Sequence, residues 1–162
     1  MARAPRLTPS PGDAVLNLAC KLVLPGLVCA HHHLYSALAR GMPPPLYPPH
    51  NFTEILDRVW WKLDRALDEE AVYLSALVGV LDAARCGVTT VIDHHASPGY
   101  LRGSLALVRS AFEEVGLRGV LCYEVTDRGG PAQRDAGLEE NRALLAAPRS
   151  PLIRGMVGAH AS

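Results

Sequence analysis

The second half of the chain alternates between short apolar runs and segments with helical periodicity. Apolar runs at 88–93, 119–125 and 153–159 predict strands, and the segments 104–115 and 138–147 between them predict helices. A further apolar run at 21–30, bent at Pro25-Gly26, predicts an earlier strand, followed by two helices with N-caps at Thr53 and Asp68. Strands separated by helices of this length form right-handed βαβ units, so we expect an α/β fold with a parallel sheet.

The number of strands limits the architecture. About four strands with helices between them make half of a (β/α)8 TIM-like barrel, which takes about 250 residues. We therefore expect residues 21–162 to form the N-terminal half of a barrel, and residues 1–20 to be disordered or a residual strand segment. A half barrel exposes two sheet edges and an apolar face, so a homo-oligomer or a complementing half barrel is expected to cover them.

The composition excludes several classes of partner. The 16 Lys and Arg residues equal the 16 Asp and Glu residues, so no charge footprint for nucleic acid or an anionic membrane exists. No apolar run approaches the roughly 20 residues of a membrane helix, and the N-terminus lacks the apolar core of a secretory signal. The four cysteines follow no paired spacing and are interpreted as reduced core thiols. We expect a cytoplasmic protein that acts on a small molecule.

The strongest local signal is His31-His32-His33, which directly follows the first apolar run. Residues i and i+2 of a strand point to the same side, so His31 and His33 can converge on one ion while His32 points away. Neutral imidazole is a ligand for zinc, iron and nickel. The alternative is a chance run of histidines on a surface loop.

Polar side chains also stand at the ends of the other predicted strands. His94 and His95 follow the second strand, Glu124 lies at the end of the third, and His160 ends the last. Functional groups of α/β barrels sit at the C-terminal ends of the strands, so four such ends together indicate a site. Because His94 and His95 alternate, at most one of them should face the barrel mouth.

Two other groups of residues have a structural interpretation. Trp60, Trp61 and Tyr73 could form a platform for ring stacking, but their helical spacing favours packing in the core. Glu139 and Glu140 could form a carboxylate pair, but a solvated helix face is the simpler interpretation.

Several stretches resemble a known family. The sequence LVLPGLVCAHHHLYSALARGM resembles the first-strand signature of the amidohydrolase superfamily, in which the two outer histidines of HxH bind metal. The strings WWKLDRALDEE, GVTTVIDHHASPGYLRGSL and VGLRGVLCYEVTDR resemble the SsnA-type aminohydrolases, relatives of the cytosine, adenosine and guanine deaminases and of the chlorohydrolases. The resemblance covers about residues 21–162.

The resemblance implies a metal-dependent hydrolase with a deformed barrel. The metal, zinc first with iron or nickel as alternatives, would activate a water for attack on the amino-bearing carbon of a purine- or pyrimidine-like ring. His31 and His33 would be metal ligands. The residues expected to contact substrate are Tyr35, Ser36, His94, His95, Glu124 and His160.

The sequence also departs from the family pattern. Relatives have an N-terminal β-subdomain, whereas about 20 residues precede the signature here, and Cys20 stands where a turn glycine is usual. The family's later strands would supply two more histidine ligands, a glutamate and an aspartate, none of which this sequence holds. We therefore expect a truncated chain that is inactive alone. The alternatives are a non-catalytic fragment that binds metal weakly and self-associates, or a metal-carrying module that depends on the three histidines only.

Overall fold

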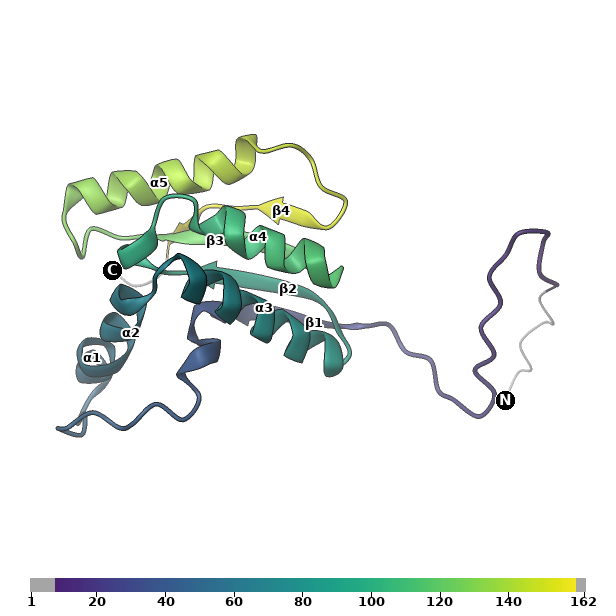
Figure 1. Ribbon diagram of the computed structural model, residues 1–162, viewed down its shortest axis with the longest axis horizontal. Coiled ribbons are helices and arrows are strands. Elements are labelled where there is room, and N and C mark those ends of the chain that lie inside the picture. Colours follow the sequence, from purple (N-terminus) through teal and green to yellow (C-terminus); the bar gives the residue numbers. More distant parts are fainter. Residues whose placement is uncertain (1–7, 160–162) are drawn as a thin grey trace.

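The computed structural model describes residues 8–159, which contain one parallel sheet (Figure 1). Its strands are paired in the order β1-β2-β3-β4, and a short β5 pairs with the far end of β3. The strands are β1 (Leu27–His32), β2 (Val88–His95), β3 (Arg118–Val125), β4 (Ile153–Gly155) and β5 (Gly158–Ala159).

The helices follow the strands in alternation. A 3-10 helix η1 leaves β1, and the next helical segment runs from α1 through a π-helical turn η2 into α2. The elements are η1 (Leu34–Ala39), α1 (Phe52–Ile55), η2 (Leu56–Trp60), α2 (Trp61–Ala66), α3 (Glu69–Arg85), η3 (Pro98–Tyr100), α4 (Ser104–Val115) and α5 (Pro131–Ala146).

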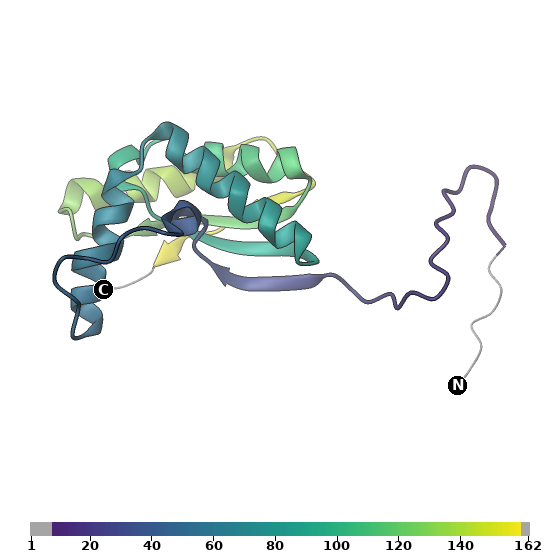
Figure 2. The same ribbon diagram turned by 60° about the horizontal axis from the view of Figure 1, so that its bottom comes forward.

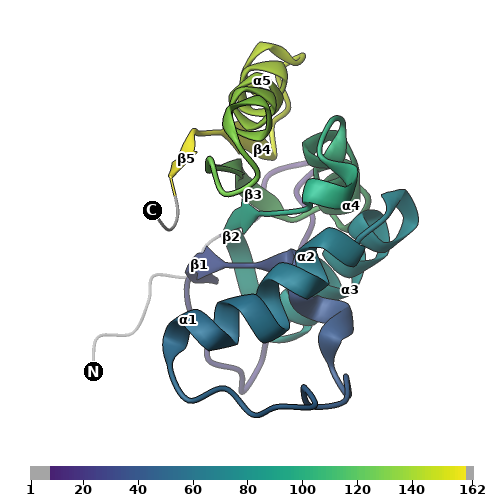
Figure 3. The same cartoon turned by 90° about the vertical axis from the view of Figure 1, so that its left-hand side faces the viewer.

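The order of the strands identifies the architecture. From β1 to β4 each strand pairs with the next one in the chain, without the reversal that marks a doubly wound sheet. The long helices α3, α4 and α5 all lie on the same face of the sheet (Figures 1 and 2), and the view along the strands shows them side by side (Figure 3). Successive crossovers to one face wind a sheet into a barrel. The prediction of a partial TIM-like barrel is therefore confirmed.

The core lies between the sheet and these helices. On β2 the buried residues alternate, with Val91, Asp93 and His95 turned towards the helices. On β3 Leu121 lies on this same face. It belongs to one buried apolar cluster with Phe112 of α4 and other helix residues. None of the described helices packs on the other face of the sheet, which carries the residues that alternate with these.

Two predicted helix boundaries are confirmed by their capping contacts. The Asp68 side chain accepts a hydrogen bond from the Ala71 N–H at 2.8 Å and caps α3. Gly116, with φ +80°, ends α4 in the left-handed conformation that glycine adopts without strain. For the first helix the cap is Asn51 rather than Thr53, because the Asn51 side chain accepts from the Glu54 N–H at 2.9 Å.

Other boundaries were wrong. Helix α5 begins at Pro131 rather than at residue 138, because Pro131 follows Gly130 and suits the first turn, whereas the polar first turns showed no apolar periodicity. The expected strand 153–159 is interrupted between β4 and β5, where the Met156 N–H donates to the Leu121 carbonyl. Strand β1 begins at Leu27, and residues 8–26 form no helix or strand and extend away from the sheet (Figure 1).

The four cysteines lie in different environments. Only Cys122 is buried in the core, whereas Cys29 is partly buried and both Cys20 and Cys86 are exposed; all four are free. The core interpretation was therefore wrong for the two exposed thiols. Within residues 8–159, no helix combines the length and the apolar character that a membrane crossing requires.

Glu139 and Glu140 turn out to have different environments. Glu139 is exposed and pairs with Arg142, as expected for a solvated face. Glu140 is only 6% exposed, and its carboxylate accepts hydrogen bonds from the N–H groups of Gly103 and Leu105 at 2.8 and 2.9 Å. The carboxylate thus satisfies the first N–H groups of α4 and ties α5 to it.

We predict that Glu140→Ala destabilises the chain by about 2–3 kcal/mol, because two buried N–H groups lose a charged acceptor. The matched control Glu139→Ala should change stability by less than about 0.5 kcal/mol. Urea unfolding of the two variants measures both effects. Equal stabilities for the two variants would show that the Glu140 contacts contribute nothing.

Candidate metal centre and adjoining cavity

Two imidazoles lie together at the end of β1, where His31 belongs to the strand and His33 directly follows it. The Nε2 atoms of His31 and His33 lie 3.0 Å apart, and the rings meet edge to face. His32 pairs in register with Asp93, which faces the helices, so its side chain is on the other side of β1. The alternation inferred from the sequence thus holds for these three histidines.

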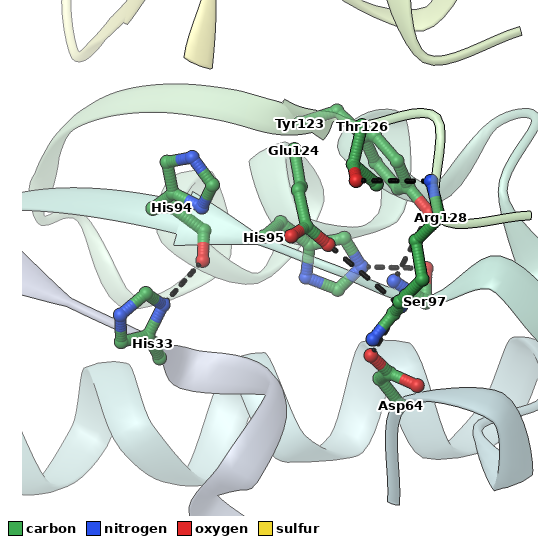
Figure 4. Close-up of polar contacts among 9 residues, drawn as sticks. All are labelled: His33, Asp64, His94, His95, Ser97, Tyr123, Glu124, Thr126 and Arg128. Carbon is green, nitrogen blue, oxygen red and sulfur yellow. Dashed lines mark hydrogen bonds and ion pairs between the residues drawn. The ribbon is translucent and has the colours of Figure 1, made fainter. Parts of the chain in front are cut away.

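A neighbouring backbone carbonyl orients His33. The Nδ1–H of His33 donates to the carbonyl oxygen of His94 on β2 at 2.9 Å (Figure 4). A carbonyl can only accept, so the Nδ1 atom carries the proton and the Nε2 atom presents its lone pair towards His31. The Ser36 hydroxyl donates to the His33 carbonyl at 2.8 Å and holds the backbone beyond it.

The turn that follows the histidines is fastened at Leu34. Its N–H donates to the buried Asp93 carboxylate at 2.7 Å, and its carbonyl accepts from the Ser75 hydroxyl at 3.0 Å. The Leu34 side chain lies directly on α3, where a Cβ added at Gly79 would come within 2.5 Å of Leu34 Cδ2. The direction in which β1 delivers His33 is therefore set by β2 and α3 together.

These features fit a metal ligand pair. Two nitrogens bound to one tetrahedral zinc ion are roughly 3.3 Å apart, given zinc–nitrogen distances near 2.0–2.1 Å. Histidine ligands commonly donate their other ring N–H to a backbone carbonyl, as His33 does. Within residues 8–159, however, no set of three or more His, Cys, Asp or Glu side chains is arranged to hold a metal ion. The described residues bring together two candidate ligands, His31 and His33.

A cavity of about 250 Å³ adjoins the histidine pair. It lies between the ends of β2 and β3 and the helical segment that contains η2. The helical wall includes the π-helical turn, in which the Trp61 N–H donates to the Leu56 carbonyl. The lining residues are His33, Tyr35, Ser36, Phe52, Leu56, Trp60, Trp61, Asp64, His94, Ala96, Glu124 and Arg128.

An ion pair closes one part of this cavity. Asp64 on α2, 2% exposed at its side chain, accepts a hydrogen bond from Arg128 Nη2 at 2.7 Å (Figure 4). The guanidinium lies 5.0 Å from the centre of the Trp61 ring, in a cation–π arrangement. Glu124 Oε2 is 3.9 Å from the same Nη2. Burial raises the pKa of Asp64 above its ordinary value, and Arg128 opposes this rise.

Glu124 and Tyr35 share this environment. Burial raises the pKa of Glu124, an effect that Arg128 opposes and Asp64 reinforces. Burial also raises the pKa of Tyr35 to about 12, so its hydroxyl stays protonated near neutrality. The cavity therefore combines an aromatic wall with one cation, two carboxyl groups and a phenol.

His95 lies elsewhere. It is fully buried on the helix side of β2, and its Nε2–H donates to the Ser97 hydroxyl at 2.8 Å, because that hydroxyl donates in turn to the Tyr100 carbonyl. Burial lowers the pKa of His95 to about 3, so it stays neutral. His94 lines the cavity and His95 does not, which agrees with the expected alternation.

Some site residues were missed by the sequence analysis and one lies outside the structure. Trp60 and Trp61 were assigned to the core, which was wrong, since both line the cavity; Tyr73 does pack against the core. Asp64 and Arg128 were not singled out, because 64 residues separate them and no local pattern links them. His160 lies outside the described residues.

Comparisons with known proteins show the family to which this chain is related. The amidohydrolase family profile matches residues 22–160. A 5-methylthioadenosine/S-adenosylhomocysteine deaminase of Pyrococcus furiosus is 30% identical over 155 residues, which cover 94% of this chain and 34% of the relative. An 8-oxoguanine deaminase of Pseudomonas aeruginosa is 32% identical over 128 residues, covering 76% and 26%.

Among solved structures, an atrazine chlorohydrolase of Arthrobacter aurescens complexed with zinc shares the fold, with a TM-score of 0.62 and 20% identity. The match covers 84% of this chain and 34% of the chlorohydrolase. The chain thus spans about a quarter to a third of the length of the proteins that it matches.

We predict that the stability of the chain falls between about pH 4 and pH 7 because of Asp93. Burial raises its pKa to about 7, so the folded state keeps a proton that the unfolded state has lost. The contribution is complete below about pH 4, decreases as the pH rises, and levels off above about pH 7, by roughly 4 kcal/mol in total.

The variant Asp93→Asn keeps an acceptor for the Leu34 N–H and cannot titrate. Its stability relative to wild type should therefore increase from pH 4 to pH 7, as measured by urea unfolding across this range. Asp57→Asn, at an exposed position, is the matched control. A constant difference between Asp93→Asn and wild type at all pH values would refute the assignment.

Proposed function

The chain belongs to the amidohydrolase family, and from this membership we propose that it carries the first metal ligands and part of the substrate pocket of a hydrolase that deaminates a nitrogen heterocycle. The observation that carries the proposal is the His31–His33 pair, whose Nε2 atoms lie 3.0 Å apart beside an aromatic-lined cavity. The deaminases among the relatives support the class of reaction.

His31 and His33 would hold a divalent metal, with zinc as the first candidate. A bound metal of this kind supplies a nucleophile at neutral pH by lowering the pKa of a coordinated water. The His94 carbonyl keeps the Nδ1 proton on His33 and leaves its Nε2 atom for the metal. The hydrogen bonds at Leu34 hold the backbone directly after His33.

The cavity would receive the heterocycle. The side chains of Trp60 and Trp61 give it an aromatic wall, which suits a planar ring, and walls of this kind exclude water from the reacting atoms. We propose that Tyr35, Ser36, His94 and Glu124, which line the cavity, contact the substrate. His160 is proposed for the same role from the sequence, whereas the burial of His95 gives it no access to a ligand in this cavity.

The 162-residue polypeptide by itself is proposed to be inactive. Catalytic zinc sites generally have three protein ligands and an open position, and residues 8–159 bring two histidines together. Two imidazoles bind zinc weakly. The activity proposed above therefore concerns these residues as part of a complete site.

We predict that the purified chain carries less than one equivalent of zinc and releases no ammonia from a panel of purines, pyrimidines and adenine nucleosides. His31→Ala and His33→Ala should each weaken zinc binding at least about tenfold, because one of two ligands is lost. His50→Ala, at an exposed histidine in the loop between η1 and α1, is the matched control. Metal analysis and a zinc titration with a competing chelator measure the binding.

Two outcomes would contradict different parts of this proposal. Unchanged zinc affinity in both His31→Ala and His33→Ala would show that the pair is not the metal site. A full equivalent of zinc together with measurable ammonia release would show that the chain is active alone.

The edge strand β1 supports a further part of the proposal, which is self-association. Leu27 and Val28 on the edge strand β1 are 60% and 62% exposed, and β1 has one unpaired edge among the described residues. We predict dimers or larger assemblies at micromolar concentration in light scattering coupled to gel filtration. Val28→Lys should shift the distribution towards monomer. A monomeric wild-type chain would contradict this expectation.

A further inference from the structure

The Asp64–Arg128 ion pair is incompletely hydrogen bonded. One bond joins Arg128 Nη2 to Asp64 Oδ2, at 2.7 Å. The other oxygen of Asp64, Oδ1, and the other terminal nitrogen of Arg128, Nη1, are shielded from water, and neither atom has a hydrogen-bond partner within residues 8–159. Buried polar atoms of this kind are rare in proteins, because each has lost its hydrogen bonds to water and has formed no other in their place. The pair thus has one acceptor and one donor that remain to be satisfied.

The position of the pair makes a ligand a natural partner for these atoms. Asp64 and Arg128 both line the cavity that His33 borders, and Trp61 lies against the guanidinium. Arg128 follows the end of β3 and keeps 15% of its side chain exposed. A turn of this side chain towards the cavity would bring Nη1 to a ligand and open access to the Asp64 carboxylate beside it.

We propose that the Asp64–Arg128 pair binds the lactam edge of an oxo-substituted heterocycle. The ring carbonyl oxygen would accept from Arg128 Nη1, and the adjacent ring N–H would donate to Asp64 Oδ1. This proposal rests on the proposed function for the orientation of the ring, and it deepens it by naming a class of substrate.

The chemistry of the pair excludes two other kinds of ligand group. A carboxylate offers acceptors only, and one of its oxygens would face the Asp64 carboxylate. A lactam whose own ring nitrogen carries a sugar or another substituent lacks the N–H that would donate to Asp64. A lactam offers one acceptor next to one donor, which complements the two unsatisfied atoms.

The position of the histidines sets the orientation. In a deamination the amino-bearing carbon must lie towards His31 and His33, so the edge at Asp64 and Arg128 is a second edge of the same ring. An aminopurine with an oxo group has such an edge, whereas the adenine ring of a nucleoside offers its only donor at the amino group itself. Of the two relatives described above, the inference therefore favours the chemistry of 8-oxoguanine over that of the adenine nucleosides.

The two tryptophans of the chain allow a direct test, because both line this cavity. The indole N–H signals of the full 162-residue chain, labelled with nitrogen-15, are followed by NMR during titration without metal. Hypoxanthine has the lactam edge, purine lacks it, and adenosine represents the nucleosides. We expect both indole signals to shift, and hypoxanthine to bind about tenfold or more tightly than purine and adenosine.

Variants separate recognition from a structural role of the ion pair. In Arg128→Met, hypoxanthine should bind no better than purine, so the ratio of the two affinities should fall to about one. Arg128→Lys, which keeps the charge, should restore part of the preference. The control Arg109→Met removes an arginine that pairs with Glu113 outside the cavity and should keep the full preference. Dispersed indole signals in each variant verify that it is folded.

Several results would overturn the inference. These are an absence of hypoxanthine binding to the wild-type chain, equal affinities for hypoxanthine and purine, tighter binding of adenosine, or an unchanged preference in Arg128→Met. The last result would mean that the pair only joins α2 to the end of β3, with water completing its hydrogen bonds. Because the titration contains no metal, its failure is distinct from a failure of the zinc test on His31 and His33.

Discussion

The hydrogen bond from the Leu34 N–H to the buried Asp93 carboxylate is the contact on which the site depends. It joins the turn after β1 to the middle of the sheet, at the point where the chain leaves the two histidines. Burial of this carboxyl group disfavours its charge, yet its replacement by an apolar residue would leave the Leu34 N–H without an acceptor. In the same turn, the Leu34 carbonyl accepts a hydrogen bond from the Ser75 hydroxyl of α3. Strand, turn and helix therefore hold one another in place.

The cavity beside the histidines is built in the same way from distant segments. One wall comes from the helical segment around η2, which contributes Trp60 and Trp61. The other wall comes from the ends of β2 and β3, which carry His94 and Glu124. Arg128 connects the two walls through its ion pair with Asp64 and its contact with Trp61. The cavity proposed to bind a ring is thus formed between elements that are not neighbours in the sequence.

Sequence reasoning was accurate where a local pattern carries the information. The alternation of strands and helices, the cap at Asp68 and the stop at Gly116 each depend on residues within a few positions of one another. It was inaccurate at α5, whose first turns lack apolar periodicity and begin at a Gly-Pro pair. It also failed for Glu140. This residue is a glutamate like its exposed neighbour Glu139, but its carboxylate accepts hydrogen bonds from N–H groups at the start of another helix.

The sequence alone determined that this protein has a parallel α/β sheet of the amidohydrolase type and that His31 and His33 lie on one side of the first strand. Strand alternation and the family signature are local, so no long-range packing was needed to read them. Only the tertiary structure decided which polar residues meet: that His94 orients His33, that His95 is buried, and that Asp64 and Arg128 pair in the wall of the cavity. Such contacts depend on the register of parallel strands and on the direction of each helix, neither of which is encoded in a short stretch of sequence.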